Sequence, residues 1–232
     1  LNASHLEALF ERTETIILEV NRNYPRCCGG DNTRIHISRV DMVVEGGDPP
    51  LSQLPEAQPD EVDEAVANLI VPRIRNGSCL QLGIGGMPNA VGSLIAESDL
   101  KDLGCHTGTI SDAFMELYRA GKLTGRRKEI DNGLATWNLA MGSQELYDWL
   151  DAEPGIFHPG DVDYIHSPER MSKMSNFIGI MGGVQLDLMG QENAESAGRR
   201  QLSGIGGQLD FLEGAYRSKG GKGFICINSS RM

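Results

Sequence analysis

The residues with the clearest chemical potential form a glycine-rich turn, Gly83-Ile84-Gly85-Gly86-Met87, directly after a short apolar segment. Pro88 and Asn89 then open a stretch with apolar residues at helical spacing. A strand, a glycine turn and a helix N-terminus build an anion-binding corner, because glycine lets the backbone approach a ligand and the first helical N–H groups point at it. The pattern therefore indicates a backbone-lined ligand site, although a tight strand-to-helix connection without a ligand would look the same.

Two common nucleotide-binding motifs are excluded at this turn. The dinucleotide fingerprint needs G-x-G-x-x-G, and here the sixth position is Pro88, with no acidic residue in a clear second-strand context further on. A P-loop needs Gly-Lys-Ser/Thr, which does not follow. The ligand must therefore be identified from other parts of the chain.

Five segments in order extend the pattern over nearly the whole sequence: GIGGMPNAV, DLGCHTG, GSQELYDWL, VQLDLMGQENAES and SGIGGQLDFLEGAYRSKGGKGFICINS. Together they resemble the acetyl-CoA hydrolase/transferase family, which includes butyryl-CoA:acetate and 4-hydroxybutyrate CoA-transferases. The resemblance implies an α/β fold, a largely parallel sheet covered by helices, of the ribose-phosphate-isomerase-like type found in CoA-transferase halves. It also implies coenzyme A as a substrate, with no permanently bound cofactor.

The same resemblance suggests how the chain is divided. Members of the family are usually much longer, and this chain begins with Leu1 rather than Met. We expect 1–60 to hold the end of an N-terminal CoA-transferase domain plus a linker, because 46–60 contain four prolines and two glycines. We expect 61–232 to hold a C-terminal CoA-transferase domain that is incomplete at its C-terminus.

The family's catalytic motif is altered in this chain. In the family it reads His-Thr-Glu, and the glutamate attacks the acyl-CoA thioester and passes through a glutamyl-CoA thioester in a ping-pong transfer. Here it reads His106-Thr107-Gly108, and glycine has no carboxylate. The resemblance thus predicts an acyl-CoA:carboxylate CoA-transferase for acetate, butyrate or 4-hydroxybutyrate, with impaired covalent chemistry at Gly108. A non-catalytic CoA-binding or structural subunit and a slow acyl-CoA thioester hydrolase remain alternatives.

Further site residues follow from the resemblance. Gly83–Met87 would line the pantetheine and thioester region, and Gly183 and Gly206 fall on other positions that contact CoA. His106, next to the nucleophile position, would help to shape the site or act as a base, although a lone histidine at a strand end is more often structural. Carboxylates that could replace the glutamate on paper are Asp112, Glu116, Glu192 and Glu195. Asp112 and Glu116 lie on the next helix, one to two turns away, and side chains so placed rarely reach the point set by residue 108. Glu192 and Glu195 are expected to be structural.

The charge composition limits the kinds of partner that the chain is expected to bind. The 232 residues carry a net charge of −11, which argues against a nucleic-acid-binding face. Because CoA is an anion, its phosphates would need local positive charge, and the candidates are Arg126-Arg127-Lys128 and the pair Lys219/Lys222. A solvated surface is the alternative for both clusters.

Cysteines and histidines predict neither disulfides nor metal. The five cysteines form no C-x-x-C pair, and the five histidines are dispersed. No run of 18 apolar residues exists, so no membrane span is expected. The pattern suits a reducing cytoplasm, and we expect a homo-oligomer whose partners are acyl-CoA and a short-chain carboxylate.

Alternating patterns predict the elements that position these residues. Asp60 should cap a helix with Val62, Val66, Leu69 and Ile70 facing the core. The expected strands lie at 15–20, 40–45, 78–83, 103–106, 135–141, 177–181, 184–188 and 223–227. The expected helices lie at 4–12, 88–97, 111–121 and 143–150.

Overall fold

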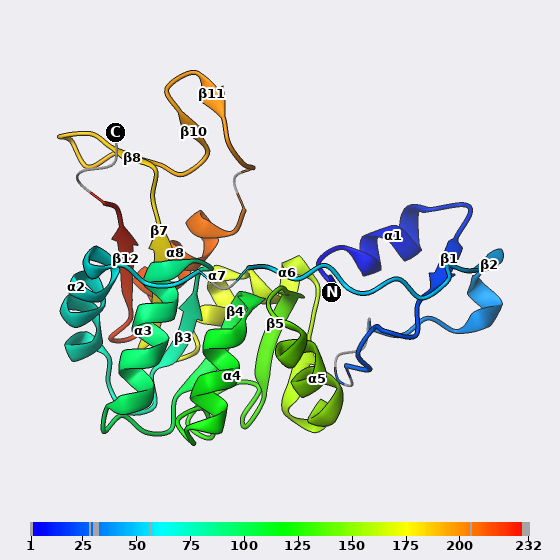
Figure 1. Ribbon diagram of the computed structural model, residues 1–232, viewed down its shortest axis with the longest axis horizontal. Helices are drawn as coiled ribbons and strands as arrows, with labels where there is room; N and C mark the ends of the chain where they lie inside the picture. Colours follow the sequence, from blue (N-terminus) through cyan, green and yellow to red (C-terminus); the bar gives the residue numbers. More distant parts are fainter. Residues whose placement is uncertain (1, 28, 30–32, 56, 205, 229–232) are drawn as a thin grey trace.

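The computed structural model describes residues 2–27, 29, 33–55, 57–204 and 206–228. Its body is a six-stranded sheet in the order β12-β7-β3-β4-β5-β6, in which every pairing is parallel (Figure 1). The strands are β3 (Cys79–Leu82), β4 (Gly104–Ile110), β5 (Ala135–Ala140), β6 (Phe157–Pro159), β7 (Phe177–Gly182) and β12 (Lys222–Cys226). The α/β architecture with a largely parallel sheet is confirmed.

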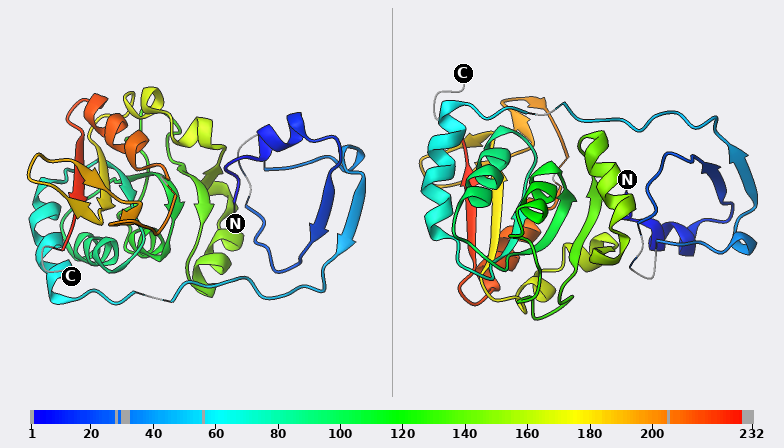
Figure 2. Two further views of the ribbon diagram at one scale, coloured as in Figure 1. Left: turned by 90° about the horizontal axis from the view of Figure 1, so that it is seen from above. Right: turned by 60° about the horizontal axis from the view of Figure 1, so that its bottom comes forward.

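Helices cover both faces of this sheet (Figure 2). One face carries α2 (Glu61–Ile70), α3 (Gly86–Glu97), α4 (Asp112–Arg119) and α5 (Gln144–Ala152), and the other carries α7 (Pro168–Met171) and α8 (Gln208–Arg217). The short helix α6 (Val162–Ile165) follows β6, and single 3-10 turns lie at Ile37–Arg39, Val71–Arg73 and Pro154–Ile156.

Two apolar clusters fill the space between these layers. Successive residues of a strand point to opposite faces, so Leu80 of β3 packs in the α3/α4 cluster while Cys79 packs with Phe177 and Phe211 beneath α8. Burial on both faces explains why β7 reads as a near-continuous apolar run. The helix α8 and the strand β6 were not expected from the sequence.

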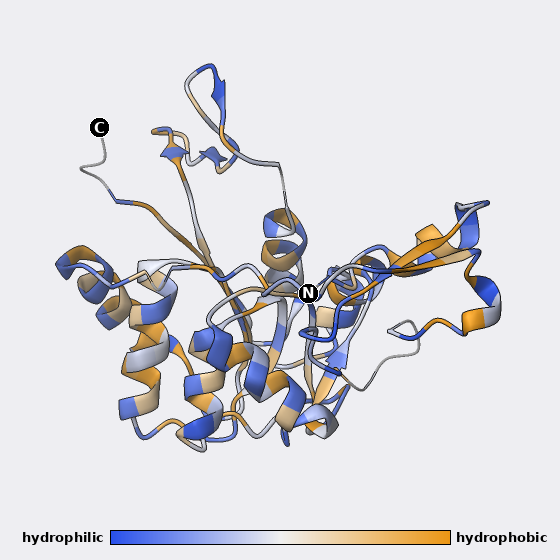
Figure 3. Ribbon diagram, turned by 45° about the vertical axis from the view of Figure 1, so that its right-hand side comes forward, coloured by the Kyte–Doolittle hydropathy of each residue, from blue (hydrophilic) through white to orange (hydrophobic). Residues whose placement is uncertain are grey.

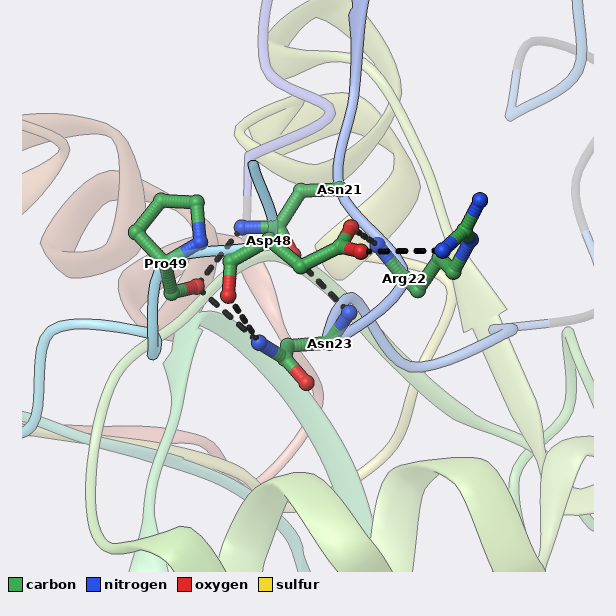
Figure 4. A network of polar contacts seen from close by, with 5 residues as sticks. All are labelled: Asn21, Arg22, Asn23, Asp48 and Pro49. Carbon is green, nitrogen blue, oxygen red and sulfur yellow. Dashed lines mark hydrogen bonds and ion pairs between the residues drawn. The ribbon is translucent and has the colours of Figure 1, made fainter. Parts of the chain in front are cut away.

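The segment before α2 lies beside the body (Figure 1). It contains α1 (Leu6–Arg12) and a two-stranded parallel sheet, β1 (Ile17–Val20) with β2 (Met42–Glu45). Asp48 and Pro49 tie the start of the following linker to the turn after β1. Arg22 N–H donates to Asp48 Oδ1 at 2.7 Å, and Asn21 Nδ2 donates to the Pro49 carbonyl at 2.9 Å (Figure 4).

Between β7 and α8 the chain forms an arm above the carboxyl ends of the strands (Figure 1). It holds the antiparallel pairs β8 (Gln185–Leu186) with β9 (Glu192–Asn193), and β10 (Ser196–Ala197) with β11 (Arg200–Gln201). The predicted sheet strand 184–188 was therefore wrong. Only two of its residues are extended, and Leu188 is fully exposed, because the apolar run has no core to cover.

The helix after Asp60 forms as predicted, but its orientation differs. The capping box is present: the Asp60 carboxylate accepts from two first-turn N–H groups, and Asp63 accepts from the Asp60 N–H. Ile70 is buried and Val66 packs partly against the core, but Val62 and Leu69 are exposed. At the edge of the body α2 packs mainly against α3, so the stripe that it buries is narrower than its apolar face. The helices that cover the sheet carry both hydrophobic and hydrophilic residues (Figure 3).

We predict that the chain associates with itself in solution through the β1–β2 sheet. Ile17 and Met42 are 60% and 55% exposed, and a two-stranded sheet with open edges invites further pairing. Light scattering should give a mass above that of the monomer, and Val43→Lys should lower it. Leu69→Lys, which charges an exposed apolar residue of α2, is the control. A monodisperse monomer with a cooperative melt would contradict this expectation.

No helix in the described part of the chain combines the length and apolar character needed to cross a membrane.

Candidate active site

The sheet reverses its winding direction at β3 and β7. These strands are neighbours in the sheet, but β3 leads into α3 on one face and β7 leads through the arm into α8 on the other. Open α/β sheets bind ligands outside the carboxyl ends of the strands at such a switch point. The fold therefore directs attention to the residues just after Leu82 and Gly182.

Two adjoining cavities open at this point. The larger, the central cavity, has a volume of about 640 Å³ and lies between the ends of β3, β4 and β7 and the start of α8. The smaller, the glycine-loop cavity, has a volume of about 360 Å³ and lies between α2, the start of α3 and the end of β12. Ile84 and Gly182 line both. A cavity of about 740 Å³ between residues 21–26 and α5 is larger, but it lies away from these strand ends.

Local structure requires glycine in the loop after β3. Gly85 has φ 124°, a conformation that residues with a Cβ rarely adopt, and a Cβ on Gly86 would collide with the Asp63 carboxylate. The N–H groups of Gly86 and Met87 precede the first helical hydrogen bond of α3, from Asn89 N to Gly85 O at 3.2 Å. Both residues line the glycine-loop cavity, and with Asp63 so close a neutral carbonyl would suit these N–H groups better than a phosphate.

The structure brings the sequence-predicted glycines to these two cavities. The central cavity is lined by Gly83, Ile84, Gly108 and Gly206. The glycine-loop cavity is lined by Ile84, Gly85, Gly86, Met87 and Gly183. Segments far apart in the chain therefore converge, and contact with CoA stays a prediction for each residue. Ile205, between the second pair of glycines, lies outside the described residues.

His106 is not in this group. It lies inside β4 rather than at its end, is completely buried, and lines neither cavity. Its Nε2 is 2.7 Å from the Ile165 carbonyl and its Nδ1 is 2.7 Å from Thr136 Oγ1. Burial, followed by the nearby Lys128 charge, lowers its pKa to about 3. The geometry supports a structural role for His106, which joins β4 to β5 and α6. It does not support a role as a general base.

A second histidine, His166, lies where the sequence places the nucleophile. A Cβ built on Gly108 would lie 3.3 Å from His166 Nε2 and 3.2 Å from Phe211 Cε2. The ring packs on the backbone of Gly207, where any Cβ would collide with it. The sequence carries no local signal for His166, because it comes from the end of α6 and meets Gly108 only in the folded sheet.

Other polar side chains of the central cavity were also missed. Asn138 and Gln81 are buried in its wall, and Gln208 opens α8 beside it. Among the described residues, three buried polar atoms at this cavity have no hydrogen-bond partner: Gln81 Oε1, His166 Nε2 and Gln208 Nε2. Such atoms are rare in folded proteins and mark a place for a ligand or water. Gln208 follows directly on the Gly-Gly motif, which could have drawn attention to it.

The basic clusters proposed for phosphate lie at the wrong edge of the sheet. Arg126 and Arg127 pair with Asp102, and Lys128 is buried with its Nζ donating to the Cys105 carbonyl at 2.9 Å. Lys222 begins β12 and donates to a carbonyl at the amino ends of the strands. Where the chain is described, no Lys or Arg lines either cavity, while two acidic residues, Asp60 and Asp63, line the glycine-loop cavity.

No replacement carboxylate lines the central cavity in the described part of the chain. Asp112 accepts hydrogen bonds from Ser143 N–H and Oγ at 3.0 and 2.5 Å and so fixes the start of α5. Glu116 is exposed on α4, and Glu192 and Glu195 belong to the arm. Within the described ranges there is also no cluster of three or more potential metal ligands.

Comparisons with known sequences identify the family of the chain. Residues 142–232 match the family model of the acetyl-CoA hydrolase/transferase C-terminal domain. The chain is 53% identical to the butyryl-CoA:acetate CoA-transferase of Anaerostipes caccae, over 99% of this chain and 51% of that protein. It is 40% identical to the 4-hydroxybutyrate coenzyme A transferase of Clostridium kluyveri, over 95% of this chain and 50% of that one.

Solved structures give the same result. RipA from Yersinia pestis superposes with a TM-score of 0.89 at 33% identity, covering 100% of this chain and 50% of RipA. The 4-hydroxybutyrate CoA-transferase from Porphyromonas gingivalis gives a TM-score of 0.83 at 32% identity, covering 96% and 52%. The chain spans about half the length of the curated relatives it matches. In sequence and in fold, the chain belongs to the acetyl-CoA hydrolase/transferase family.

Proposed function

We propose that this chain supplies the acyl-CoA site of a CoA-transferase that acts on short-chain carboxylic acids such as acetate, butyrate or 4-hydroxybutyrate. The observation that carries the proposal is the convergence of two glycine turns and Gly108 on the central cavity at the winding switch of the sheet. The names of the relatives supply the substrate class: butyryl-CoA with acetate, and 4-hydroxybutyrate.

In the proposed complex the pantetheine arm enters along the glycine-loop cavity and the thioester lies in the central cavity beside Gly108. Gln208 Nε2, which has no partner and belongs to a residue that lines the central cavity, would donate to the carbonyl oxygen of the thioester as it gains negative charge. Backbone N–H groups at the start of α3 would donate to a neutral carbonyl of the pantetheine arm. Transfer by way of a covalent adduct would need a carboxylate on residue 108. Gly108 provides none, so we expect transfer by this chain to be near background.

Gly108 also favours a second candidate, a CoA-binding subunit without catalysis. Both candidates predict CoA binding, and they differ in turnover. A measurement of turnover, rather than of binding affinity, is therefore needed to distinguish the two candidate functions.

Isothermal calorimetry with CoA tests the shared prediction. Binding should be detected at millimolar CoA or below, and Gly85→Ala should weaken it about ten-fold or more, because the strained φ would displace the loop. Gly121→Ala is the matched control, since Gly121 has a similarly restricted φ of 69° at the other edge of the sheet. Folded protein that gives no heat with millimolar CoA would overturn the proposal.

A further inference from the structure

We propose that His166, held by Asp210, is the general base for hydrolysis of an acyl-CoA thioester in the central cavity. The inference rests on the proposed acyl-CoA site and assigns to this chain an activity that needs no carboxylate at position 108. The water would occupy the space that a side chain on residue 108 would otherwise fill.

The pair has the geometry of a base and the group that orients it. His166 Nδ1 lies 3.4 Å from Asp210 Oδ2, in the first turn of α8, and the ring centroids of His166 and Phe211 are 4.8 Å apart. An Nδ1–H that donates to the carboxylate leaves the lone pair on Nε2, the nitrogen that lies 3.3 Å from the position of a Cβ on Gly108. In many hydrolytic active sites a base activates the nucleophile, and a third group holds the base in the correct orientation.

Electrostatics keeps the His166 ring neutral. Burial lowers its pKa below the usual value, and Asp210 opposes this shift. His106 in β4, on which His166 exerts a small effect, is kept uncharged by its own burial. A base must be unprotonated to accept a proton, so His166 is in its working form at neutral pH.

The residue at position 108 determines what occupies the space in front of His166 Nε2. The Cβ of any side chain there would lie 3.3 Å from Nε2, and glycine leaves the volume beyond that point open to the cavity. His166 Nε2 and Gln208 Nε2 are both buried without a partner at this cavity, among the described residues. The first can accept a proton from water, and the second can donate to the carbonyl oxygen.

The reaction balances without a further reactant. Water oxygen attacks the thioester carbonyl carbon while one of its protons moves to His166 Nε2, which gives a tetrahedral oxyanion and an imidazolium. The oxyanion collapses, the C–S bond breaks, and the CoA sulfur takes the proton from Nε2. The products are one carboxylic acid and one CoA thiol, and the histidine returns to its neutral state.

The experiment measures thiol release from butyryl-CoA with no carboxylate acceptor present. We expect slow turnover, and His166→Asn should lower kcat by about 10²–10⁴-fold with little change in KM. The rate should fall with decreasing pH at an inflection below 6.5, and Asp210→Asn should move that inflection further down, because the carboxylate raises the pKa of His166. Glu213→Gln, an exposed carboxylate of the same helix that pairs with Arg217, is the matched control.

The outcomes separate the two proposals. Absence of CoA binding by calorimetry in the unmodified chain would overturn the proposed function and the dyad with it. Binding together with equal hydrolysis by the unmodified chain and His166→Asn would overturn only the dyad. If Asp210→Asn leaves the pH of the inflection in the hydrolysis rate unchanged, Asp210 has a purely structural role. That result would also contradict the inference.

Discussion

Gly108→Glu should turn this chain into one that forms a covalent glutamyl-CoA adduct, with acyl transfer increased by on the order of a million-fold. The site can accept the side chain. Gly108 does not have a left-handed φ, and a Cβ would meet only the edge of Phe211 and the His166 ring, at 3.2 and 3.3 Å. Shifts of a few tenths of an ångström in two side chains are sufficient. The carboxylate would then extend into the central cavity, where the thioester is proposed to bind.

Incubation with acyl-CoA, trapping with hydroxylamine and mass mapping would locate the adduct. Gly108→Gln fills the same volume without a nucleophile and serves as the control, so it should give neither adduct nor transfer. Both substitutions fill the space before His166 and should lower hydrolysis, whereas only Gly108→Glu should raise transfer. A Gly108→Glu chain that binds CoA but forms no adduct would refute the assignment of position 108. Transfer at a high rate by the unmodified chain would require another carboxylate.

Acid should destabilise the fold through His106. Its pKa in the fold is about 3, against 6.5 for an unperturbed histidine, because burial and the nearby Lys128 both disfavour its charge. Below pH 6.5 the unfolded chain therefore binds a proton that the folded chain does not bind until near pH 3. The free energy of unfolding should fall by about 1.4 kcal/mol per pH unit from this residue, or about 2 kcal/mol between pH 6.5 and 5.

Urea denaturation at pH 7, 6 and 5 would measure this slope. The reference is His106→Gln, which cannot titrate, and its slope should be smaller by about one proton. His166 shifts in the same direction, so His166→Asn should remove a separate and smaller part. Equal slopes for the unmodified chain and His106→Gln would show that His106 does not titrate in the way its burial implies.

The sequence predicts those structural features that depend on residues close together along the chain. Strand, glycine turn and helix at 79–97 are local, and the cap at Asp60 is set within three residues. These features fix the parallel sheet and the loop at the site. Gly183 follows β7, and Gly206 lies just before α8. Both glycines reach the cavities because β7 ends and α8 starts at the same edge of the sheet.

What the sequence does not predict depends on the folded arrangement. His166 and Gln208 meet Gly108 only because α6 and α8 pack on one face of the sheet. Composition does not tell at which edge of the sheet a basic residue lies, so the sequence offers Arg126–Lys128 as a candidate for the CoA phosphates although the cluster lines neither cavity. The apolar pattern places His106 at the end of a strand, whereas β4 continues to Ile110 and His106 lies inside it.

The distribution of charge at the cavities has a consequence for the speed of ligand capture. CoA carries several negative charges, and it would approach a protein of net charge −11 towards cavities with Asp60 and Asp63 in one wall and, in the described chain, no basic residue in either. Electrostatic steering, which accelerates many encounters, would here act as repulsion. Added salt shortens the reach of that repulsion, so the association rate constant should rise with ionic strength while the contacts inside the cavities stay the same.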